Sequence, residues 1–128
     1  MPLILHYIWL LPLAIAAASN AIMDTCKDHY YTSIFNSSNF NPWFWNTEIS
    51  WKNKYIDRDV WRGRTKLIVQ LTDSWHLFKS LMIVMQAVSL MLAAIYYKPI
   101  YTYFEAIVLY GIVWNGMFNL FYNKILKR

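Results

Sequence analysis

Three long, mostly apolar stretches alternate with polar ones along the chain. They run over residues 2–23, 67–97 and about 100–122. The second stretch combines a more polar segment, 67–79, with an uncharged run, 80–97, and we expect both to form one helix. Each stretch is long enough for the roughly 20 residues that a helix needs to cross a bilayer. The pattern predicts an all-α integral membrane protein whose residues 1–128 form a single membrane domain with three transmembrane helices.

The interval 24–66 is polar and rich in aromatic residues. Turn-forming residues at 36–39 and at Asn41-Pro42 precede a cluster of tryptophan and phenylalanine. Six cations and two acids follow between Lys52 and Lys66. Amphipathic aromatic rings and basic side chains are both favoured at the boundary between lipid and water. We therefore expect an interfacial loop at 24–66, between the first and second spans, with its rings inserted among the headgroups.

The composition supports a membrane protein. Hydrophobic residues make up 58% of the 128 positions and aromatic residues 19%, more than a soluble domain of this length buries. The single cysteine, Cys26, excludes a disulfide within the chain. A cleaved signal peptide is the alternative for the first stretch, because Ala16-Ala17-Ala18 resembles a cleavage site. No Lys or Arg precedes its apolar core, so we expect this stretch to be retained.

The distribution of charge predicts both a partner and an orientation. The net charge is +5, and the basic residues concentrate in the 24–66 loop and at the C-terminus, beside apolar spans. This favours anionic lipid headgroups as partners, and no nucleic-acid-binding motif accompanies the charge, so no nucleic acid is expected. If three helices cross the membrane, Lys98 is the only Lys or Arg on the same side as the N-terminus. The positive-inside rule then predicts a cell-membrane protein with the loop and C-terminus in the cytoplasm and the N-terminus outside.

The string TDSWHLFKS at 72–80 carries the strongest candidate for chemistry. Asp73, His76 and Lys79 are spaced three apart, so on a helix they share one broad face. A carboxylate three residues from an imidazole can orient the ring as an acid, a base or a metal ligand. The alternative is that these residues only solvate the end of the second span, with Lys79 reaching the headgroups.

A second polar cluster leaves the first span at the same predicted membrane level. Asp24 and Asp28 share a stripe of a continued helix, and His29 points about 140° away from Asp24 unless a turn intervenes. The topology brings this cluster level with the polar start of the second span, which predicts one shared catalytic or metal site for a divalent ion. The members of this predicted site are Asp24, His29, Asp73 and His76. The cations expected to bind lipid phosphate beside it are Lys52, Lys54, Arg58, Arg62 and Arg64. The alternative is an ion-pair network that holds two helix ends together.

A stripe of small and amide residues runs along the third predicted span. Amide groups within lipid seek partners and glycines allow close approach, so the stripe is expected to face other helices. The predicted helix-packing residues are Gly111, Asn115, Gly116 and Asn119. Three spans offer little internal partner surface, so we expect a homo-oligomer or a subunit of a larger membrane complex.

Three strings resemble a pattern of a group of small polytopic membrane proteins from bacteria and phages. They are NAIMDTCKDHYYTSIF, NPWFWNTEISWKNKY and LTDSWHLFK, which contain M-D…H, S-W-x-N-K-Y and T-D-x-W-H, and they cover about residues 20–80. The resemblance implies that the residues carrying the pattern belong to one unit, and it implies no reaction. Those residues are Asp24, His29, Ser33, Trp51, Asn53, Lys54, Asp73, Trp75 and His76.

Two functions are consistent with these features. As an enzyme, the protein would act on a phosphorylated or anionic lipid at the cytoplasmic headgroup layer, with His76 as base or metal ligand and Asp73 orienting it. As a non-enzyme, it would be a pore-forming or structural subunit, with Glu105 and the asparagine stripe lining or sealing an oligomer axis. The motifs GxSxG, Walker A, HExxH and CxxC are absent from the sequence, so the common soluble catalytic schemes have no support.

Overall fold

A computed structural model describes residues 2–59, 63–98 and 103–128. These residues form helices and contain no β-strand, which confirms the predicted all-α class. The three long helices are α2 (Leu10–Asp28), α5 (Ser74–Tyr96) and α6 (Phe104–Leu120), and α6 continues into the π-helical turn η4 (Phe121–Ile125). The short elements are α1 (Leu3–His6), η1 (Tyr30–Thr32), α3 (Pro42–Trp45), α4 (Thr47–Ser50), η2 (Trp51–Lys54) and η3 (Val69–Leu71).

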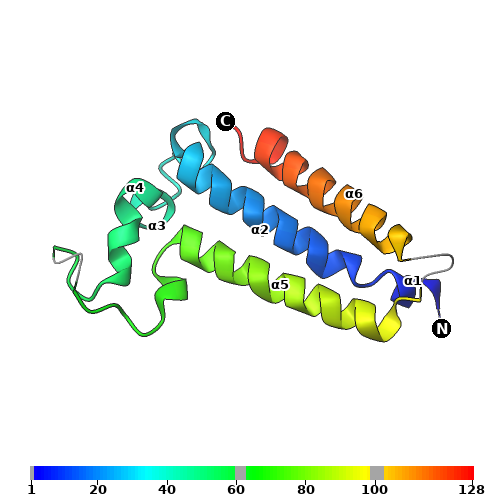
Figure 1. The fold of residues 1–128 in the computed structure, drawn as a ribbon. Coiled ribbons are helices and arrows are strands. Elements are labelled where there is room, and N and C mark those ends of the chain that lie inside the picture. Colours follow the sequence, from blue (N-terminus) through cyan, green and yellow to red (C-terminus); the bar gives the residue numbers. More distant parts are fainter. Residues whose placement is uncertain (1, 60–62, 99–102) are drawn as a thin grey trace.

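Helix α2 lies in the middle, and α5 and α6 pack mainly against it from two sides (Figure 1). Its buried positions carry small side chains, and Ala16, Ala17 and Ala21 are fully buried. Small side chains allow neighbouring helix backbones to approach closely, because no bulky group separates them. The alanine-rich sequence therefore makes α2 the element on which the bundle is assembled.

The first predicted span is interrupted near its start. The chain forms α1, turns at 7–9 and then enters α2, so 2–23 is not one continuous helix. Pro12 explains the interruption, because a proline cannot donate to the carbonyl of Ile8 and its ring clashes with that carbonyl in a continuous helix. In the first turn of α2 the missing N–H of Pro12 breaks no helical hydrogen bond.

Two helices in the described part of the chain are long and apolar enough to cross a membrane, Ser74–Tyr96 and Phe104–Ile125. None of their apolar side chains is buried inside the chain, and many are exposed, as Leu90 and Ile107 illustrate with 70% and 68% exposure. A helix buried in a soluble core would have the opposite distribution. The exposed apolar faces therefore indicate a surrounding that is itself apolar.

The second long helix begins later than predicted. Residues 67–73 precede α5 and include only the short turn η3, whereas a helix over 67–97 was expected. Asp73 has an extended backbone with φ −158° and ψ 167°, and its side chain accepts a hydrogen bond from the His76 backbone N–H. This is the geometry of a helix N-cap, which satisfies a free backbone donor at the start of the helix.

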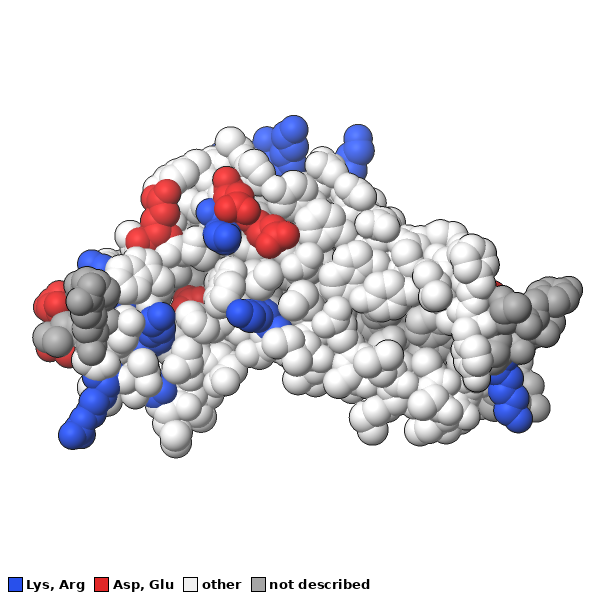
Figure 2. Space-filling model, viewed as in Figure 1, with Lys and Arg blue, Asp and Glu red and all other residues white. Residues whose placement is uncertain are grey.

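The two ends of the bundle hold different segments of the chain. At one end, the C-terminus is attached to the loop, where the Arg128 N–H donates to the Thr32 carbonyl at 2.9 Å and the Ile34 N–H to the Leu126 carbonyl at 3.0 Å. At the other end, the Lys98 N–H donates to His6 Nδ1 at 3.2 Å. Figure 2 shows charged side chains gathered over the loop and C-terminal end, beside a broad uncharged surface. The predicted pairing of segments, loop with C-terminus and N-terminus with Lys98, is present.

The first half of the interfacial loop is a packed structure that folds back onto α2. Its side chains complete a cluster in which Tyr30, Phe35 and Leu126 are buried with residues of α2. The rings of Phe35 and Trp45 are stacked with centroids 4.3 Å apart. Thr47 Oγ1 donates to the Cys26 carbonyl at 3.0 Å, which ties the start of α4 to the last turns of α2. This packing fixes where α4 and η2 lie relative to α5.

Candidate functional site

The Asp73 carboxylate both caps α5 and holds the His76 ring. Asp73 Oδ1 accepts from the His76 backbone N–H at 3.0 Å, and Asp73 Oδ2 lies 2.7 Å from His76 Nδ1. Asp73 is 1% exposed, whereas the His76 side chain is 23% exposed. Because a carboxylate oxygen accepts at Nδ1, that nitrogen carries a proton, and Nε2 of the neutral ring has the free lone pair. The pair is therefore an imidazole oriented by a buried carboxylate.

A pocket of about 300 Å³ surrounds this pair, and we call it the Asp73–His76 pocket. Its walls come from α2, from α4 with η2, and from the start of α5. The lining residues are Lys27, Thr47, Ser50, Trp51, Asp73, Trp75 and His76. Ser50 is fully buried, and its Oγ has no hydrogen-bond partner in the described residues. The pocket thus combines an oriented imidazole, a lysine cation and an unpaired hydroxyl.

Sequence reasoning did not select Lys27 or Ser50 for this site. Ser50 is the first residue of the S-W-x-N-K-Y string, so the resemblance pattern contained a signal for it. Lys27 carried no such signal, because it lies on a different helix, 46 positions before Asp73 in the sequence. Only the packing of α4 and α5 against the end of α2 brings the two residues to His76.

Several cations at the loop end of the bundle lie over aromatic rings. Arg58 lies over Trp43 at 5.2 Å and Lys79 over Trp75 at 4.4 Å from the ring centroid. Lys52 and Lys54 make the same kind of contact with their neighbouring rings, Trp51 and Tyr55. A cation over an aromatic ring is attracted to the face of the ring while its alkyl stem packs along it.

The other two cations predicted to bind phosphate are Arg64 and Arg62. Arg64 is exposed in a turn where its carbonyl accepts from the Ile56 N–H at 2.9 Å. Arg62 lies outside the described residues. Beyond this turn, Leu67 is 97% exposed, and Ile68 and Leu71 are exposed as well. The loop therefore presents apolar side chains next to its cations, which suits insertion among lipid headgroups.

His29 and Asp24 lie away from the Asp73–His76 pocket. His29 ends α2, and its ring packs edge-on against Tyr122 with centroids 5.3 Å apart. It lines a separate cavity of about 360 Å³ with Ser33 and Lys127 among its neighbours. Asp24 lies near the end of α2 and is not among the residues that line the Asp73–His76 pocket.

The structure therefore does not bring the four predicted site residues together. It joins Asp73 to His76, and no hydrogen bond or ion pair within the described ranges connects Asp24 or His29 to either. Across the same ranges, no three His, Cys, Asp or Glu side chains are grouped so that they could hold a metal ion. The reason is that α5 and η4 pack on different faces of α2, and His29 turns toward η4.

The predicted helix-packing stripe of α6 is largely exposed, and Gly116 lines a pocket with Leu10, Leu11 and Ala14 of α2. Asn115 Nδ2 donates to the Gly111 carbonyl at 2.9 Å, and Asn119 Nδ2 donates to the Asn115 carbonyl at 2.8 Å. Both asparagines and Gly116 are exposed. A Cβ added at Gly111 or Gly116 would meet no atom within 4 Å. The stripe satisfies its amide donors within its own helix and leaves its surface open.

The residues that carry the resemblance pattern fall into separate groups. Trp51, Asp73, Trp75 and His76 line one pocket, whereas His29 and Ser33 line another. Asn53 Nδ2 donates to the Trp43 and Thr72 carbonyls and so ties η2 to the residue before Asp73. Comparison of the chain with protein-family models, curated proteins and solved structures finds no match.

Proposed function

We propose that the chain crosses a membrane with three helices, α2, α5 and α6. The support for a third span is the position of α2 between the two helices that are long and apolar enough to cross. α2 has 19 residues, and at 1.5 Å per residue it extends for about 28 Å. Its uncharged part, residues 10–23, covers about 21 Å of this length, and the mostly apolar residues 3–9 before it complete the crossing, so the charged last turn lies in the headgroup layer.

The end that holds the loop and the C-terminus faces the cytoplasm in this proposal. Cations of the loop and of the C-terminal residues 124–128 gather there, whereas Lys98 lies at the opposite end beside His6. Segments rich in Lys and Arg are retained on the cytoplasmic side of a cell membrane. The N-terminus is then outside, and the Asp73–His76 pocket lies at the depth of the cytoplasmic headgroups.

The Asp73–His76 pocket binds and acts on the headgroup of a phosphorylated or anionic lipid. The observation that carries this proposal is the 2.7 Å contact between His76 Nδ1 and the buried Asp73 carboxylate, in a pocket that Lys27 also lines. Asp73 holds the ring in one tautomer, so Nε2 is free to accept a proton. Lys27 supplies positive charge for a phosphate, since an ammonium group is a compact donor to phosphate oxygens.

The proposed reaction is hydrolysis of a phosphomonoester on the lipid. His76 Nε2 accepts a proton from a water molecule while the water oxygen attacks phosphorus. The bond between phosphorus and the lipid oxygen breaks, and the imidazolium returns its proton to that oxygen, which gives a lipid alcohol and inorganic phosphate. Lys27 and the Ser50 hydroxyl stabilise the charge on the phosphate oxygens.

Phosphate release from defined vesicles tests this reaction. The purified protein is reconstituted into phosphatidylcholine vesicles with and without phosphatidic acid, and inorganic phosphate is measured over time. His76→Ala is expected to lower the rate by about 100-fold or more, since it removes the general base. Asp73→Asn is expected to lower it by about 10-fold to 100-fold, since the ring loses its orientation.

His29→Ala is the matched control, because His29 lies in the separate cavity beside Tyr122. It is expected to leave the rate unchanged. Absence of phosphate release from every vesicle, or an equal loss in His29→Ala and His76→Ala, would overturn the proposed reaction. Binding of a short-chain phosphatidic acid, but not of the matching phosphatidylcholine, by the protein in detergent, reduced by Lys27→Ala, tests headgroup binding apart from turnover.

A second candidate function is that of a structural subunit that associates through α6. The specific observation is the stripe of Asn115, Gly116 and Asn119, which is exposed, with its asparagine amides donating to carbonyls within α6 and Asn119 Oδ1 accepting from Asn123 of η4. Small and amide residues favour close contact between transmembrane helices. A second copy of the chain, meeting α6 along this stripe, would bury the amides that otherwise face lipid.

Native mass spectrometry in mild detergent tests this association. Gly116→Leu is expected to shift an oligomer to monomer, and because a Cβ at Gly116 has open space around it, the change acts between chains. Met91→Leu on the exposed face of α5 is the control and is expected to leave the oligomer intact. A wild-type protein that is monomeric at all concentrations would contradict a role of α6 in assembly.

A further inference from the structure

A cluster of polar aromatic side chains closes the end of the bundle opposite the Asp73–His76 pocket. The rings of His6 and Tyr97 have centroids 4.8 Å apart, and those of Trp9 and Tyr97 are 5.5 Å apart. Tyr7 Oη donates to Glu105 Oε1 at 3.4 Å, which links the start of the chain to the start of α6. We call these five residues the His6–Glu105 cluster. It joins α1, the turn before α2, the end of α5 and the first turn of α6.

This cluster contains most of the unpaired buried polar atoms found in the part of the chain that the structure describes. Seven buried side-chain nitrogen and oxygen atoms in the described residues lack a hydrogen-bond partner, and four of them lie here. They are His6 Nε2, Trp9 Nε1, Tyr97 Oη and Glu105 Oε2, and Tyr97 lies close enough to Glu105 to interact with its carboxylate. Trp9 is 4% exposed, so bulk water does not reach its indole freely. Buried polar groups are normally paired, and a concentration of unpaired ones indicates a place that receives a polar ligand.

The unpaired atoms include both donors and an anionic acceptor. His6 Nδ1 accepts from the Lys98 N–H, so the neutral ring carries its proton on Nε2, which is a donor. Trp9 Nε1 is a donor as well, and the Glu105 carboxylate oxygen is an acceptor. A ligand that matches this set has an ammonium group for Glu105 and oxyanions for the two N–H groups. The headgroup of an aminophospholipid carries both.

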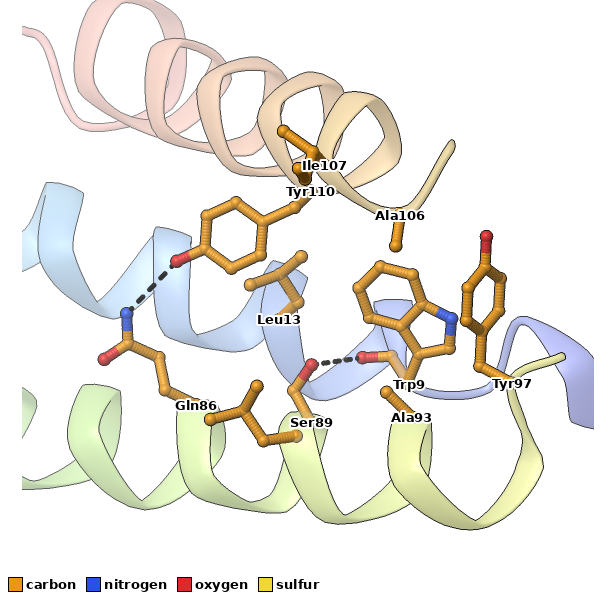
Figure 3. Close-up of a pocket in the computed structure, with 10 residues that line it drawn as sticks. Trp9, Leu13, Gln86, Ser89, Ala93, Tyr97, Ala106, Ile107 and Tyr110 are labelled. Atoms are coloured by element: carbon orange, nitrogen blue, oxygen red, sulfur yellow. Dashed lines mark hydrogen bonds between the residues drawn. The ribbon is translucent and has the colours of Figure 1, made fainter. Parts of the chain in front are cut away.

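An apolar cavity of about 530 Å³ adjoins the cluster. Trp9 and Tyr97 line its near end, and the Gln86 Nε2 to Tyr110 Oη contact of 3.5 Å marks the far end (Figure 3). The Ser89 hydroxyl donates to the Trp9 carbonyl at 2.8 Å, so it presents no free donor to the cavity. The other lining side chains are apolar, namely Leu13, Leu90, Ala93, Ala106 and Ile107. The space forms because α5 and α6 pack mainly against α2.

We propose that the cavity and the His6–Glu105 cluster together bind one aminophospholipid. An acyl chain lies between α5 and α6 over Leu13, and the headgroup lies against the cluster, with its ammonium group on Glu105 and its phosphate oxygens on the N–H groups of His6 and Trp9. The volume of the cavity is common for ligand pockets. A helix bundle in a bilayer is surrounded by phospholipids that can enter it. This binding site is independent of the Asp73–His76 pocket, which lies at the other end of the bundle.

Native mass spectrometry of the delipidated protein with three lipids of identical acyl chains tests the headgroup assignment. Phosphatidylethanolamine is expected to bind at least about tenfold more tightly than phosphatidylcholine or phosphatidylglycerol. The choline group has no N–H to donate, and the glycerol headgroup has no cation. Glu105→Gln is expected to reduce phosphatidylethanolamine binding to the level of phosphatidylcholine and to leave phosphatidylglycerol unchanged. Equal binding of all three lipids by the unmodified protein would overturn the assignment.

Filling the cavity tests where the acyl chain lies. Ala106→Phe places a ring in the cavity and is expected to weaken binding of all three lipids, whereas Leu120→Phe on the exposed far part of α6 is the matched control. Circular dichroism melting verifies that each variant folds. If Ala106→Phe does not fold, Ala93→Leu replaces it. Unchanged lipid binding in a folded cavity-filling variant would overturn the location of the chain.

Discussion

The carboxylates of Asp73 and Glu105 lie at opposite ends of the helix bundle and differ in how completely they are paired. Both oxygens of Asp73 accept hydrogen bonds from His76, one from the backbone and one from the ring. Glu105 has one weak partner, Tyr7 at 3.4 Å, and its Oε2 has none among the described residues. Asp73 is 1% exposed, and both of its His76 partners belong to the start of the helix that it caps.

This difference separates a group that builds the fold from one that can take a ligand. A carboxylate whose acceptors are all used fixes its neighbours, and its loss leaves buried donors unpaired. A carboxylate with a free, buried oxygen contributes little to folding and retains its capacity to bind. At the Asp73 end the atom that can bind a ligand is therefore His76 Nε2. At the Glu105 end it is the carboxylate itself. Three substitutions test this difference between the two ends of the bundle.

Leu126→Ala is expected to have the largest effect on stability, because it creates a cavity at the packed end of the bundle. Leu126 is 3% exposed and belongs to the buried cluster with Tyr30 and Phe35. The expected loss in free energy of unfolding is about 2 to 3 kcal/mol. Denaturant titration in detergent measures it, with Leu120→Ala as a control at an exposed leucine of α6. Equal effects of the two changes would show that the loop end is not a packed core.

Asp73→Ala is expected to lower the free energy of unfolding by about 2 kcal/mol, because it removes the N-cap of α5 and leaves the His76 N–H unpaired. Asp73→Asn retains a side-chain oxygen that can cap the helix, so its loss is expected to be smaller. The same titration measures both. An Ala variant as stable as the Asn variant would mean that the cap contributes nothing.

Glu105→Gln is expected to have the smallest effect, less than about 0.5 kcal/mol in free energy of unfolding, because the amide retains an acceptor for Tyr7. Its stability is measured in the absence of added lipid, so that only the contribution to folding is seen. A loss as large as that of Asp73→Ala would place Glu105 with the groups that build the fold and would remove the difference between the two ends.

Much of the fold follows from local patterns in the sequence. The apolar stretches predict the helices, and the paired ends of the bundle follow from their number and the position of the turns. Two helix starts differ from the prediction, and the residues responsible can be seen in the sequence. Pro12 interrupts the first apolar stretch, and Asp73 is the N-cap at which α5 begins. The central place of α2 could not be predicted, because helical spacing alone does not say which neighbour each face of a helix meets.

The candidate sites likewise combine contacts between residues close in the sequence with contacts between residues far apart in it. The Asp73–His76 contact joins residues three apart and was predictable from spacing. Lys27 and Ser50 reach the same pocket only through the fold of the loop, which no local pattern describes. The Tyr7–Glu105 contact joins residues 98 positions apart, and the predicted meeting of His29 with His76 failed because His29 turns toward η4. Tertiary packing decides each of these cases.

The arrangement of the three helices in the membrane is the premise for both proposed sites, and cysteine labelling tests it most directly. In a Cys26→Ala background, single cysteines replace Leu3 near the N-terminus, Asp59 in the loop, Lys98 in the turn and Lys124 near the C-terminus, all at exposed positions. A membrane-impermeant maleimide applied to intact cells is expected to label the Leu3→Cys and Lys98→Cys proteins and neither of the others until the membrane is permeabilised. Labelling of the Asp59→Cys and Lys98→Cys proteins from the same side would contradict the three-span arrangement and, with it, the location of both sites at opposite faces of the membrane.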